Sequence, residues 1–526
     1  MKKKAALIVD KLLVTQWQSD ALQAANDSLE ILLVLNCQNT RTKKRLLKHF
    51  FYYVLNALSL QNYLTRRRQV RFPNAKVIDF ESTNNGAWQS LPEGIYDELK
   101  RSEIDVVIKF GMNLLRVDED KSSPPILSYH HGDPSKYRGR PAGFYEVLSG
   151  EKTIGIIVQT LSNELDAGEI YAFAESKVVS YSYKKTALNF YLNSAPLLNK
   201  AVANFAAGSK VDRKSDGKNY RLPSNFKVLR FLALLGVNAI KKVVYGLFFE
   251  KKWRVATTKN VLAMTQSEIL LSRNFNEIPI SKNYNFYADP FFSEDGSKIR
   301  LEALGNKSGL GDILELEASD VSRCTTLATG KHFSYPCSFA FKGKEYILPE
   351  VASHSAPYFC EPIKSDIRYY LKGLEEKRIV DATLYFTEDK CYLFFGEDHS
   401  AHTVLNLWLS ESPFDVFKPH PKSPIAISPS DARMGGKPIS FHQKLLRFGQ
   451  NNSGEYGESL AIMQITTLSD MDYKEVKLGT IRIDKFSGPH CLSFSPDKKE
   501  LLVDFYRNEF SLFAGVRRIK ARWRKR

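Results

Sequence analysis

The chain has few cysteines, and their arrangement does not suggest a metal or disulfide site. The six cysteines lie at positions 37, 324, 337, 360, 391 and 491, with no pair separated by two residues and no histidine at zinc-ligand spacing. Structural zinc sites use closely paired cysteines, and disulfide frameworks use regularly spaced ones. We therefore predict free thiols and no metal.

Long uninterrupted apolar runs are also missing. The longest apolar stretch, residues 226–253, contains Arg230, Lys241 and Lys242, whereas a membrane-spanning helix needs about 18 or more apolar residues. The start, MKKKAALIVDKLLV, lacks a small-residue cleavage site, and Asp10 interrupts its apolar run. We predict a first β-strand over residues 5–9, and we expect residues 226–253 to pack on protein or to lie along a membrane surface.

Acidic residues are outnumbered by basic ones. The 526 residues include 75 Lys and Arg against 58 Asp and Glu, a formal charge of +17. This excess favours an anionic partner, such as a sugar nucleotide, a polyglutamylated folate, an acidic membrane surface or nucleic acid, without choosing among them. The length exceeds what one hydrophobic core supports, so two domains and a linker are expected.

Strand-like apolar runs alternate with helical patterns in the first 200 or so residues. The runs cover residues 5–9, 31–35, 77–80 and 105–110, and a helical pattern covers 19–25. This alternation predicts an α/β domain with a mainly parallel sheet. Such sheets bind ligands at the carboxyl ends of their strands.

Two basic segments each leave two interpretations open. Residues 41–68 form an apolar, aromatic helical pattern between basic clusters, and the chain ends in RRIKARWRKR. The first is either an ordinary packed helix with solvated ends or a helix that contacts anionic lipid or a partner. The second is either a solvated tail or a contact to a phosphate-bearing surface.

A turn-strand-turn-strand unit recurs from about residue 270 onward. Its copies begin at residues 287, 334, 380, 434 and 487, which lie 47, 46, 54 and 53 residues apart. A unit that returns at intervals of about 50 residues predicts a β-propeller, here with five blades. The predicted domains are an α/β domain over 1–207, a basic, partly helical linker over 208–269, the propeller over 270–515 and a basic tail over 516–526.

The residues best suited to chemistry lie between positions 128 and 170, in SYHHGDPSKYRGRPAG and the later LDAGEI. This segment resembles the catalytic core of the formyltransferase family, which includes methionyl-tRNA formyltransferase, glycinamide ribonucleotide transformylase and the sugar N-formyltransferases. His130 takes the place of the catalytic histidine, residues 137–139 (YRG) match a loop, Gly155 matches a Thr-Gly-Val glycine, and residues 165–168 (LDAG) match the closing turn. The interval of 36 residues from His130 to Asp166 agrees with the family's spacing without a gap.

The resemblance implies an enzyme that transfers a formyl group from 10-formyltetrahydrofolate to an amine. His130 would serve as general base or as a donor to the oxyanion, and Asp166 would orient it. The stretch IDVVIKFGMNLL resembles the strand and turn that shape the family's folate pocket, so Phe110, Gly111 and Met112 are expected there with Asp166.

The family's asparagine two residues before the histidine is replaced by Ser128. A hydroxyl reaches less far than an amide, and loss of an oxyanion donor costs on the order of 3 kcal/mol. Ser128 is therefore a weaker member of the catalytic set, and His131 is a candidate extra donor.

The repeats resemble five-bladed propellers of glycoside hydrolases and, more closely, the propeller domain of plant glucosamine inositolphosphorylceramide transferases. The matching residues are ADPF at 288–291, Tyr335 with Pro336, Asp381, and the glycines at 435–436. The resemblance places Asp289 and Asp381 in the central funnel, with Glu350 as the nearest replacement for the missing acid; a role in turns is the alternative for both aspartates. We favour a glycan-recognising or substrate-presenting propeller over an active hydrolase.

The predicted fold class is an α/β Rossmann-like formyltransferase domain followed by an all-β five-bladed propeller. The predicted function is N-formylation of an amino sugar or sugar nucleotide in surface-polysaccharide synthesis, with methionyl-tRNA as the alternative acceptor although nucleic acid is not the expected partner. A glycan-binding or hydrolase-like protein with a degenerate first domain is a further alternative. We expect a cytoplasmic protein, with peripheral contact to the inner membrane face left open.

Overall fold

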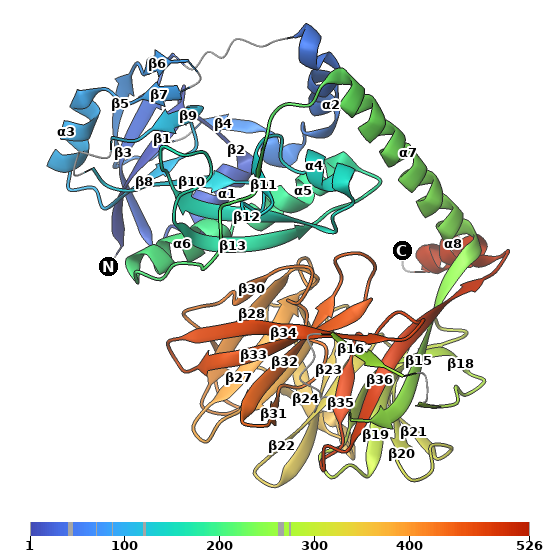
Figure 1. Ribbon diagram of the computed structural model, residues 1–526. Helices are drawn as coiled ribbons and strands as arrows, with labels where there is room; N and C mark the ends of the chain where they lie inside the picture. Colours follow the sequence, from blue (N-terminus) through green and yellow to red (C-terminus); the bar gives the residue numbers. More distant parts are fainter. Residues whose placement is uncertain are drawn as a thin grey trace. The chain divides into compact units, whose positions relative to one another are not determined.

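The computed structural model describes residues 2–524 apart from 40–45, 70, 87, 119–122, 261–267 and 273–274 (Figure 1). The chain divides into two compact units, Met1–Ile240 and Lys241–Arg526. The division falls within the range 208–269 predicted as a linker. The basic start of the predicted helical range 41–68 lies outside the described residues.

The first unit is built on one mixed sheet. Its strand order is β5-β3-β1-β8-β10-β12-β13, parallel from β5 to β10 and antiparallel from β10 to β13, with β2 and β4 extending from β1. The predicted α/β class and the four predicted strands are confirmed. The bounds are β1 Lys3–Asp10, β2 Leu13–Thr15, β3 Leu29–Cys37, β4 Arg67–Gln69, β5 Lys76–Phe80, β8 Val106–Lys109, β10 Ile126–His130, β12 Thr153–Thr160 and β13 Ile170–Lys177.

Helices flank this sheet, and two small sheets lie beside it (Figure 1). α5 and α6 contact β13 and β12, and α1 packs against both helices. The helices are α1 Gln16–Ala24, α2 Phe50–Ser59, α3 Glu93–Arg101, α4 Phe144–Ser149, α5 Tyr183–Ser194 and α6 Leu197–Ala206, with short 3-10 turns at Leu47–His49 and Tyr63–Thr65. The small sheets contain β6 Thr83–Asn85, β7 Trp88–Ser90 and β9 Leu114–Arg116, and β11 Tyr137–Gly139 with β14 Lys218–Tyr220.

The apolar stretch after residue 224 forms one long helix followed directly by a strand. The helix α7 spans Asn225–Phe248, and β15 spans Phe249–Lys259 and pairs with β36. By length and composition alone, α7 is apolar enough to cross a membrane, which the charges of Arg230, Lys241 and Lys242 had led us not to expect. That the stretch packs on protein or lies along a membrane surface stays a prediction.

The second unit is all-β except for the end of α7 and the C-terminal helix α8, Ala514–Arg524, among the residues described. Its strands form five sheets, which are antiparallel apart from the parallel pair β16 and β34. The sheets are β18 Tyr284–Phe292, β19 Lys298–Gly305, β20 Gly311–Glu317 and β21 Cys324–Ala328; β22 Ser334–Phe341, β23 Lys344–Glu350, β24 Tyr358–Glu361 and β25 Lys364–Tyr370; β26 Ile379–Phe386, β27 Cys391–Glu397, β28 Val404–Ser410, β29 Lys418–Pro419 and β30 Ala426–Ile427; β31 Ile439–Phe441, β32 Lys444–Asn451, β33 Ser459–Leu468, β34 Tyr473–Ile483 and β16 Glu268–Leu271; and β15, β17 Asn276–Glu277, β35 Leu492–Phe494 and β36 Glu500–Phe510.

One backbone feature returns in each of the five sequence repeats. Asp289, Tyr335 and Asp381 have φ values of 49°, 44° and 49°, and the glycines at the corresponding positions, Gly436 and Gly488, have 127° and 126°. In β18, β22 and β26 the pairing register shifts at this point. Residues other than glycine rarely adopt positive φ, so positive φ at corresponding positions of all five repeats, with a register shift in three of them, supports a common structural unit.

Candidate active site

His130 and Asp166 lie together in the first unit. His130 ends β10 and is buried, and its Nδ1 lies 3.4 Å from Oδ2 of Asp166. The other ring nitrogen, Nε2, lies 3.0 Å from the carbonyl oxygen of Tyr137. A carbonyl only accepts hydrogen bonds, so Nε2 carries the proton of this bond.

The loop that carries Asp166 is held in place by its neighbours. The backbone N–H of Gly139 donates to Oδ2 of Asp166 at 2.7 Å, and Nε of Arg138 donates to the carbonyl oxygen of Leu165 at 2.9 Å. Gly168 passes so close to Thr160 that a Cβ would lie 1.6 Å from its carbonyl oxygen. The YRG loop and the LDAG turn therefore fix the carboxylate beside the imidazole.

The predicted folate-pocket residues follow β8. The backbone N–H groups of Phe110 and Gly111 donate to the carbonyl oxygen of Ile8, at 3.0 and 2.9 Å, and that of Met112 donates to Oδ1 of Asp10 at 2.8 Å. A Cβ on Gly111 would lie 2.5 Å from the backbone of Val9. The turn thus packs on the carboxyl end of β1, the edge at which parallel sheets bind ligands.

Lys109 is a charged residue that sequence reasoning missed. It ends β8 and pairs in register with Ser128 on β10. Burial lowers the pKa of Lys109 to about 8, although the nearby carboxylates of Asp10 and Asp166 act to raise it. A single lysine within an apolar strand gave no signal of this placement, which depends on the pairing of β8 with β10.

His131 is not placed as an extra donor beside His130. Its Nε2 lies 2.9 Å from Oγ of Ser194, and its ring packs against Trp17 and Phe190. Burial lowers the pKa of His131 to about 3, so the ring is neutral. His131 follows the end of β10 and lines the same pocket as His130, but its Nε2 is engaged with Ser194.

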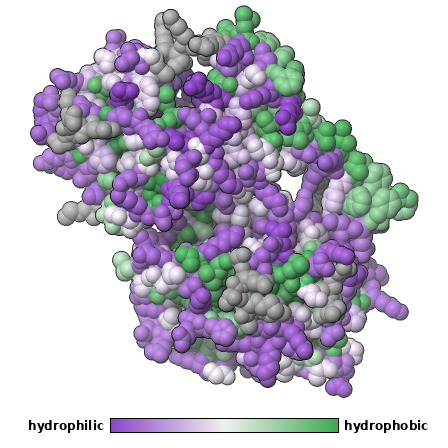
Figure 2. Space-filling view, viewed as in Figure 1, coloured by the Kyte–Doolittle hydropathy of each residue, from purple (hydrophilic) through white to green (hydrophobic). Residues whose placement is uncertain are grey.

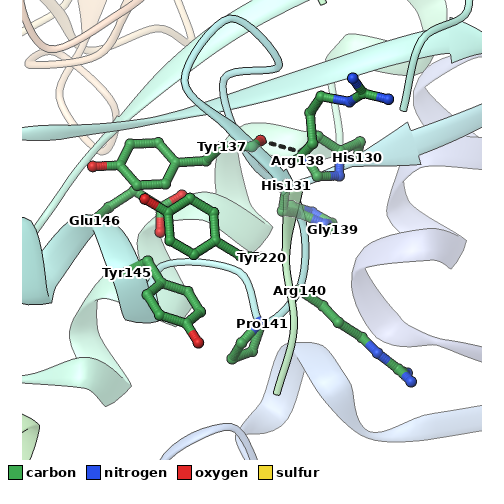
Figure 3. Close-up of a pocket in the computed structure, with 10 residues that line it drawn as sticks. All are labelled: His130, His131, Tyr137, Arg138, Gly139, Arg140, Pro141, Tyr145, Glu146 and Tyr220. Atoms are coloured by element: carbon green, nitrogen blue, oxygen red, sulfur yellow. Dashed lines mark hydrogen bonds between the residues drawn. The ribbon is translucent and has the colours of Figure 1, made fainter. Parts of the chain in front are cut away.

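A small pocket opens beside His130 (Figure 3). The rings of Tyr137 and Tyr220 stack with their centroids 5.4 Å apart, and the ring centroid of Tyr145 lies 4.2 Å from that of Tyr220. Burial raises the pKa of Glu146 in this wall to about 8, so its carboxyl group is mostly protonated at neutral pH. Tyr220 comes from β14, within the predicted linker, and its role was not foreseen.

A second cluster of titratable groups lies in the second unit, where Asp289 was predicted. Nδ1 of His490 lies 2.6 Å from Oδ2 of Asp504, and its Nε2 lies 3.2 Å from Oδ1 of Asp289. Burial lowers the pKa of His490, but the two carboxylates outweigh it and raise the value to about 10. A protonated imidazole therefore joins two buried carboxylates.

The other predicted propeller residues belong to the same buried network. Nε of Arg433 donates to Oδ2 of Asp381 at 2.5 Å, and the N–H of Asp381 donates to Oε2 of Glu350 at 3.3 Å. Burial and Asp381 raise the pKa of Glu350 well above its usual range, against the opposing charge of Arg433.

Glu302, on β19, is a member of this network that sequence reasoning missed. Burial and the nearby carboxylates of Asp289 and Glu350 raise its pKa well above the usual range. Its surroundings therefore favour the protonated form of a carboxyl group near an aspartate, the combination that glycosidic chemistry uses. Its place in the strand run RLEAL gave no distinguishing signal.

One group of three could hold a metal ion by geometry. Ligand atoms of Asp289, His490 and Asp504 lie within 4.8 Å of one another. Nδ1 of His490 and Oδ2 of Asp504, 2.6 Å apart, form an ion pair when the imidazole is protonated, so a cation would have to displace the imidazole proton. The absence of a metal stays a prediction.

Comparison with known proteins finds one family model over part of the chain and relatives of two kinds. Residues 274–488 match the family model described as glucosamine inositolphosphorylceramide transferase 1, N-terminal. The transferase of that name from Arabidopsis thaliana is 29% identical over 209 residues, which cover 37% of this chain and 27% of the relative, and that from Oryza sativa subsp. japonica is 28% identical over 207 residues, 36% and 28%. The chain thus spans about a quarter of the length of these relatives.

A methionyl-tRNA formyltransferase from Finegoldia magna is 21% identical over 204 residues, which cover 36% of this chain and 64% of that protein. Among solved structures, a phosphoribosylglycinamide formyltransferase from Anaplasma phagocytophilum is similar over 43% of this chain and 96% of that one, with 16% identity and a TM-score of 0.28. A 4-N formyltransferase from Francisella tularensis is similar over 44% and 87%, with 11% identity and a TM-score of 0.27.

Proposed function

We propose that the first unit transfers a formyl group from 10-formyltetrahydrofolate to a primary amine. The observation that carries this proposal is the pair of His130 and Asp166, 3.4 Å apart at the end of β10 and beside a pocket. The sequence similarity to a methionyl-tRNA formyltransferase supports the same chemistry. Phe110, Gly111, Met112 and Asp166 are the residues proposed to hold the folate.

In this reaction the amine nitrogen bonds to the formyl carbon, the bond from that carbon to the folate nitrogen breaks, and a proton passes from the attacking to the leaving nitrogen. Negative charge develops on the formyl oxygen. The Nε2–H of His130 donates to a carbonyl oxygen at 3.0 Å, so it can donate to the formyl oxygen once that oxygen replaces the carbonyl of Tyr137. Asp166 orients the ring and stabilises its charged form.

Lys109 adds a positive charge to the proposed site. Its backbone pairs with Ser128, which stands where the formyltransferases have an asparagine. An ammonium group stabilises a developing oxyanion electrostatically. We propose that Lys109 offsets the shorter reach of the serine hydroxyl.

The variant Lys109→Met tests this role through its pH profile. Because the pKa of Lys109 is about 8, its charge is present below that pH and is lost above it. We expect kcat/KM of the wild type to fall as pH rises through about 8. Lys109→Met should lose about tenfold in kcat/KM near pH 7 and should no longer show this fall, whereas Lys109→Arg should keep its activity to higher pH. If Lys109→Met still shows the fall near pH 8, a group other than Lys109 causes it.

We propose an amino sugar or sugar nucleotide as the acceptor. The relatives matched by the second unit carry glucosamine in their name, and a carbohydrate-handling unit beside a formyltransferase suits such an acceptor. Methionyl-tRNA is the alternative. Fold-level analogy is the basis of this choice.

For the second unit we propose a five-bladed propeller, each of the five sheets forming one blade, that recognises a glycan. Glu302, kept protonated near Asp289, is the observation that favours a sugar site here. Asp381 and Glu350 would belong to the same site. Cleavage of a glycoside is the alternative activity of this cluster.

Incubation of the protein with 10-formyltetrahydrofolate and a panel of amino-sugar nucleotides, with methionyl-tRNA in parallel, tests these proposals. Release of tetrahydrofolate that depends on one sugar amine would support the sugar assignment. Release only with the tRNA would overturn the acceptor but keep formyl transfer. Binding of glycans without turnover of any amine would favour a binding protein.

A further inference from the structure

An exposed apolar stripe runs along α7. Most of its successive members are three residues apart and so fall on one side of the helix, and Ile240 is 65% and Phe226 is 78% exposed. Large apolar side chains on one face of a surface helix mark an interaction site. The exposed members are Phe226, Leu229, Leu232, Val237, Ile240, Val243, Val244 and Leu247.

The opposite face of α7 is fixed to the first unit. Val228 and Phe231 are fully buried, and Phe231 stacks on Phe144 with ring centroids 4.4 Å apart. Nδ2 of Asn238 donates to the carbonyl oxygen of Ser180 at 3.1 Å. The first four turns of α7 are therefore held on the first unit by one face, and the apolar stripe lies on the other face.

Helix α2 extends the apolar stripe within the first unit. Nδ2 of Asn225, at the start of α7, donates to the carbonyl oxygen of Leu47 at 2.9 Å, and its Oδ1 accepts from the N–H of Phe51 at 3.1 Å. Leu47 is 90% and Leu58 is 73% exposed. Figure 1 shows α2 beside the first turns of α7, and Figure 2 shows hydrophobic residues gathered over this region. We call this the α2/α7 surface.

The charges on this surface have one sign. Residues 46–60 and 225–248 contain no aspartate or glutamate, and they contribute Lys48, Lys227, Arg230, Lys241 and Lys242. Arg230 and Lys241 lie one helical turn or less from members of the apolar stripe. An apolar face bordered by cations matches a bilayer that contains anionic lipid.

We propose that the α2/α7 surface docks on an anionic lipid bilayer, with α7 lying in the interface rather than crossing it. Crossing would require α7 to give up the contacts of Phe231 and Asn238 with the first unit. It would also bring Lys241 and Lys242 into the hydrocarbon, which is costly. A second copy of the chain is a poorer occupant, because two such surfaces would face each other with like charges.

Co-flotation with vesicles of phosphatidylcholine, with and without phosphatidylglycerol, tests this proposal. We expect the full chain to bind the anionic vesicles, to be released by high salt and by an alkaline carbonate wash, and to bind the neutral vesicles at least about tenfold more weakly. Leu229→Asp/Ile240→Asp should lose at least about tenfold in binding. Ile363→Asp, a matched change at a residue that is 96% exposed in the second unit, should bind as the wild type does.

The triple variant Arg230→Gln/Lys241→Gln/Lys242→Gln, which keeps the apolar stripe, should bind anionic and neutral vesicles equally weakly. Thermal unfolding of each variant checks that it is folded, and each changed residue is exposed. Equal binding by Leu229→Asp/Ile240→Asp and the wild type would overturn the proposal. Resistance of the wild type to the carbonate wash would show instead that α7 spans the bilayer. If Leu229→Asp/Ile240→Asp changed the protein from dimer to monomer without loss of lipid binding, the surface would be one of self-association.

Discussion

Replacing His130 with glutamine should lower kcat for formyl transfer by about a thousandfold, since a positioned acid or base contributes about a hundredfold to ten-thousandfold. Glutamine keeps a donor near the Tyr137 carbonyl, so the pocket should keep its shape while the imidazole is lost. His130 is buried and its Nδ1 lies 3.4 Å from Asp166. Stopped-flow or steady-state release of tetrahydrofolate would measure the change.

Two matched variants make this prediction specific. Asp166→Asn should give a smaller loss, because it removes the charge that stabilises the imidazolium but leaves the ring in place. His49→Gln should retain full activity, since this histidine contacts the carbonyl oxygen of Pro223 at 2.8 Å. Full activity in His130→Gln, or an equal loss in His49→Gln, would show that the imidazole of His130 does not take part in the reaction.

Arg433→Met in the second unit should lower the free energy of unfolding by about 3 to 5 kcal/mol at pH 7, the usual cost of removing one partner of a buried ion pair. Arg433 donates to Asp381 at 2.5 Å, and its Nη2 lies 3.8 Å from Oε2 of Glu350. Methionine fills much of the same volume, so the loss comes mainly from carboxylates left without their cation. Denaturant unfolding followed by tryptophan fluorescence would measure it.

The pH dependence of this loss has a definite sign. Glu350 already has a raised pKa, and removal of Arg433 raises it further. A carboxyl group with a raised pKa in the folded state favours folding below its unfolded pKa and disfavours it as pH rises. The deficit of Arg433→Met should therefore shrink between pH 7 and pH 5. A deficit that grows on acidification, or that is absent at pH 7, would contradict the proposed charge network.

Much of the first unit could be predicted from local patterns. The runs before residue 110 alternate with helical patterns, as is typical of an α/β sheet. The 36-residue interval joins His130 to Asp166 because two turns with closely packed glycines, Gly139 and Gly168, close the loop. Lys109 could not be found in this way. Its position beside Ser128 depends on β8 pairing with β10 across chain distant in sequence.

In the second unit the repeat could be predicted, because a similar segment returns about every 50 residues, and the structure has a residue with positive φ at one position of each copy. The functional network was only partly readable. Glu302 and Asp504 occupy ordinary strand positions. Glu302 stands opposite Ala288 in the sheet that carries Asp289, and the packing of two sheets brings Asp289 to His490 and Asp504. The exposure of α7 could not be predicted either, because the sequence of an apolar helix with a few charges is similar whether the helix is buried or exposed.

Transfer of an isotopically labelled formyl carbon from 10-formyltetrahydrofolate to an amino-sugar nucleotide, followed by mass spectrometry, tests the central claim most directly. The wild-type protein should give a labelled N-formyl sugar together with an equal amount of tetrahydrofolate, and His130→Gln should give almost none. If no amino-sugar nucleotide supplied became labelled, or if the wild type and His130→Gln gave the same labelling, formyl transfer by His130 would be contradicted.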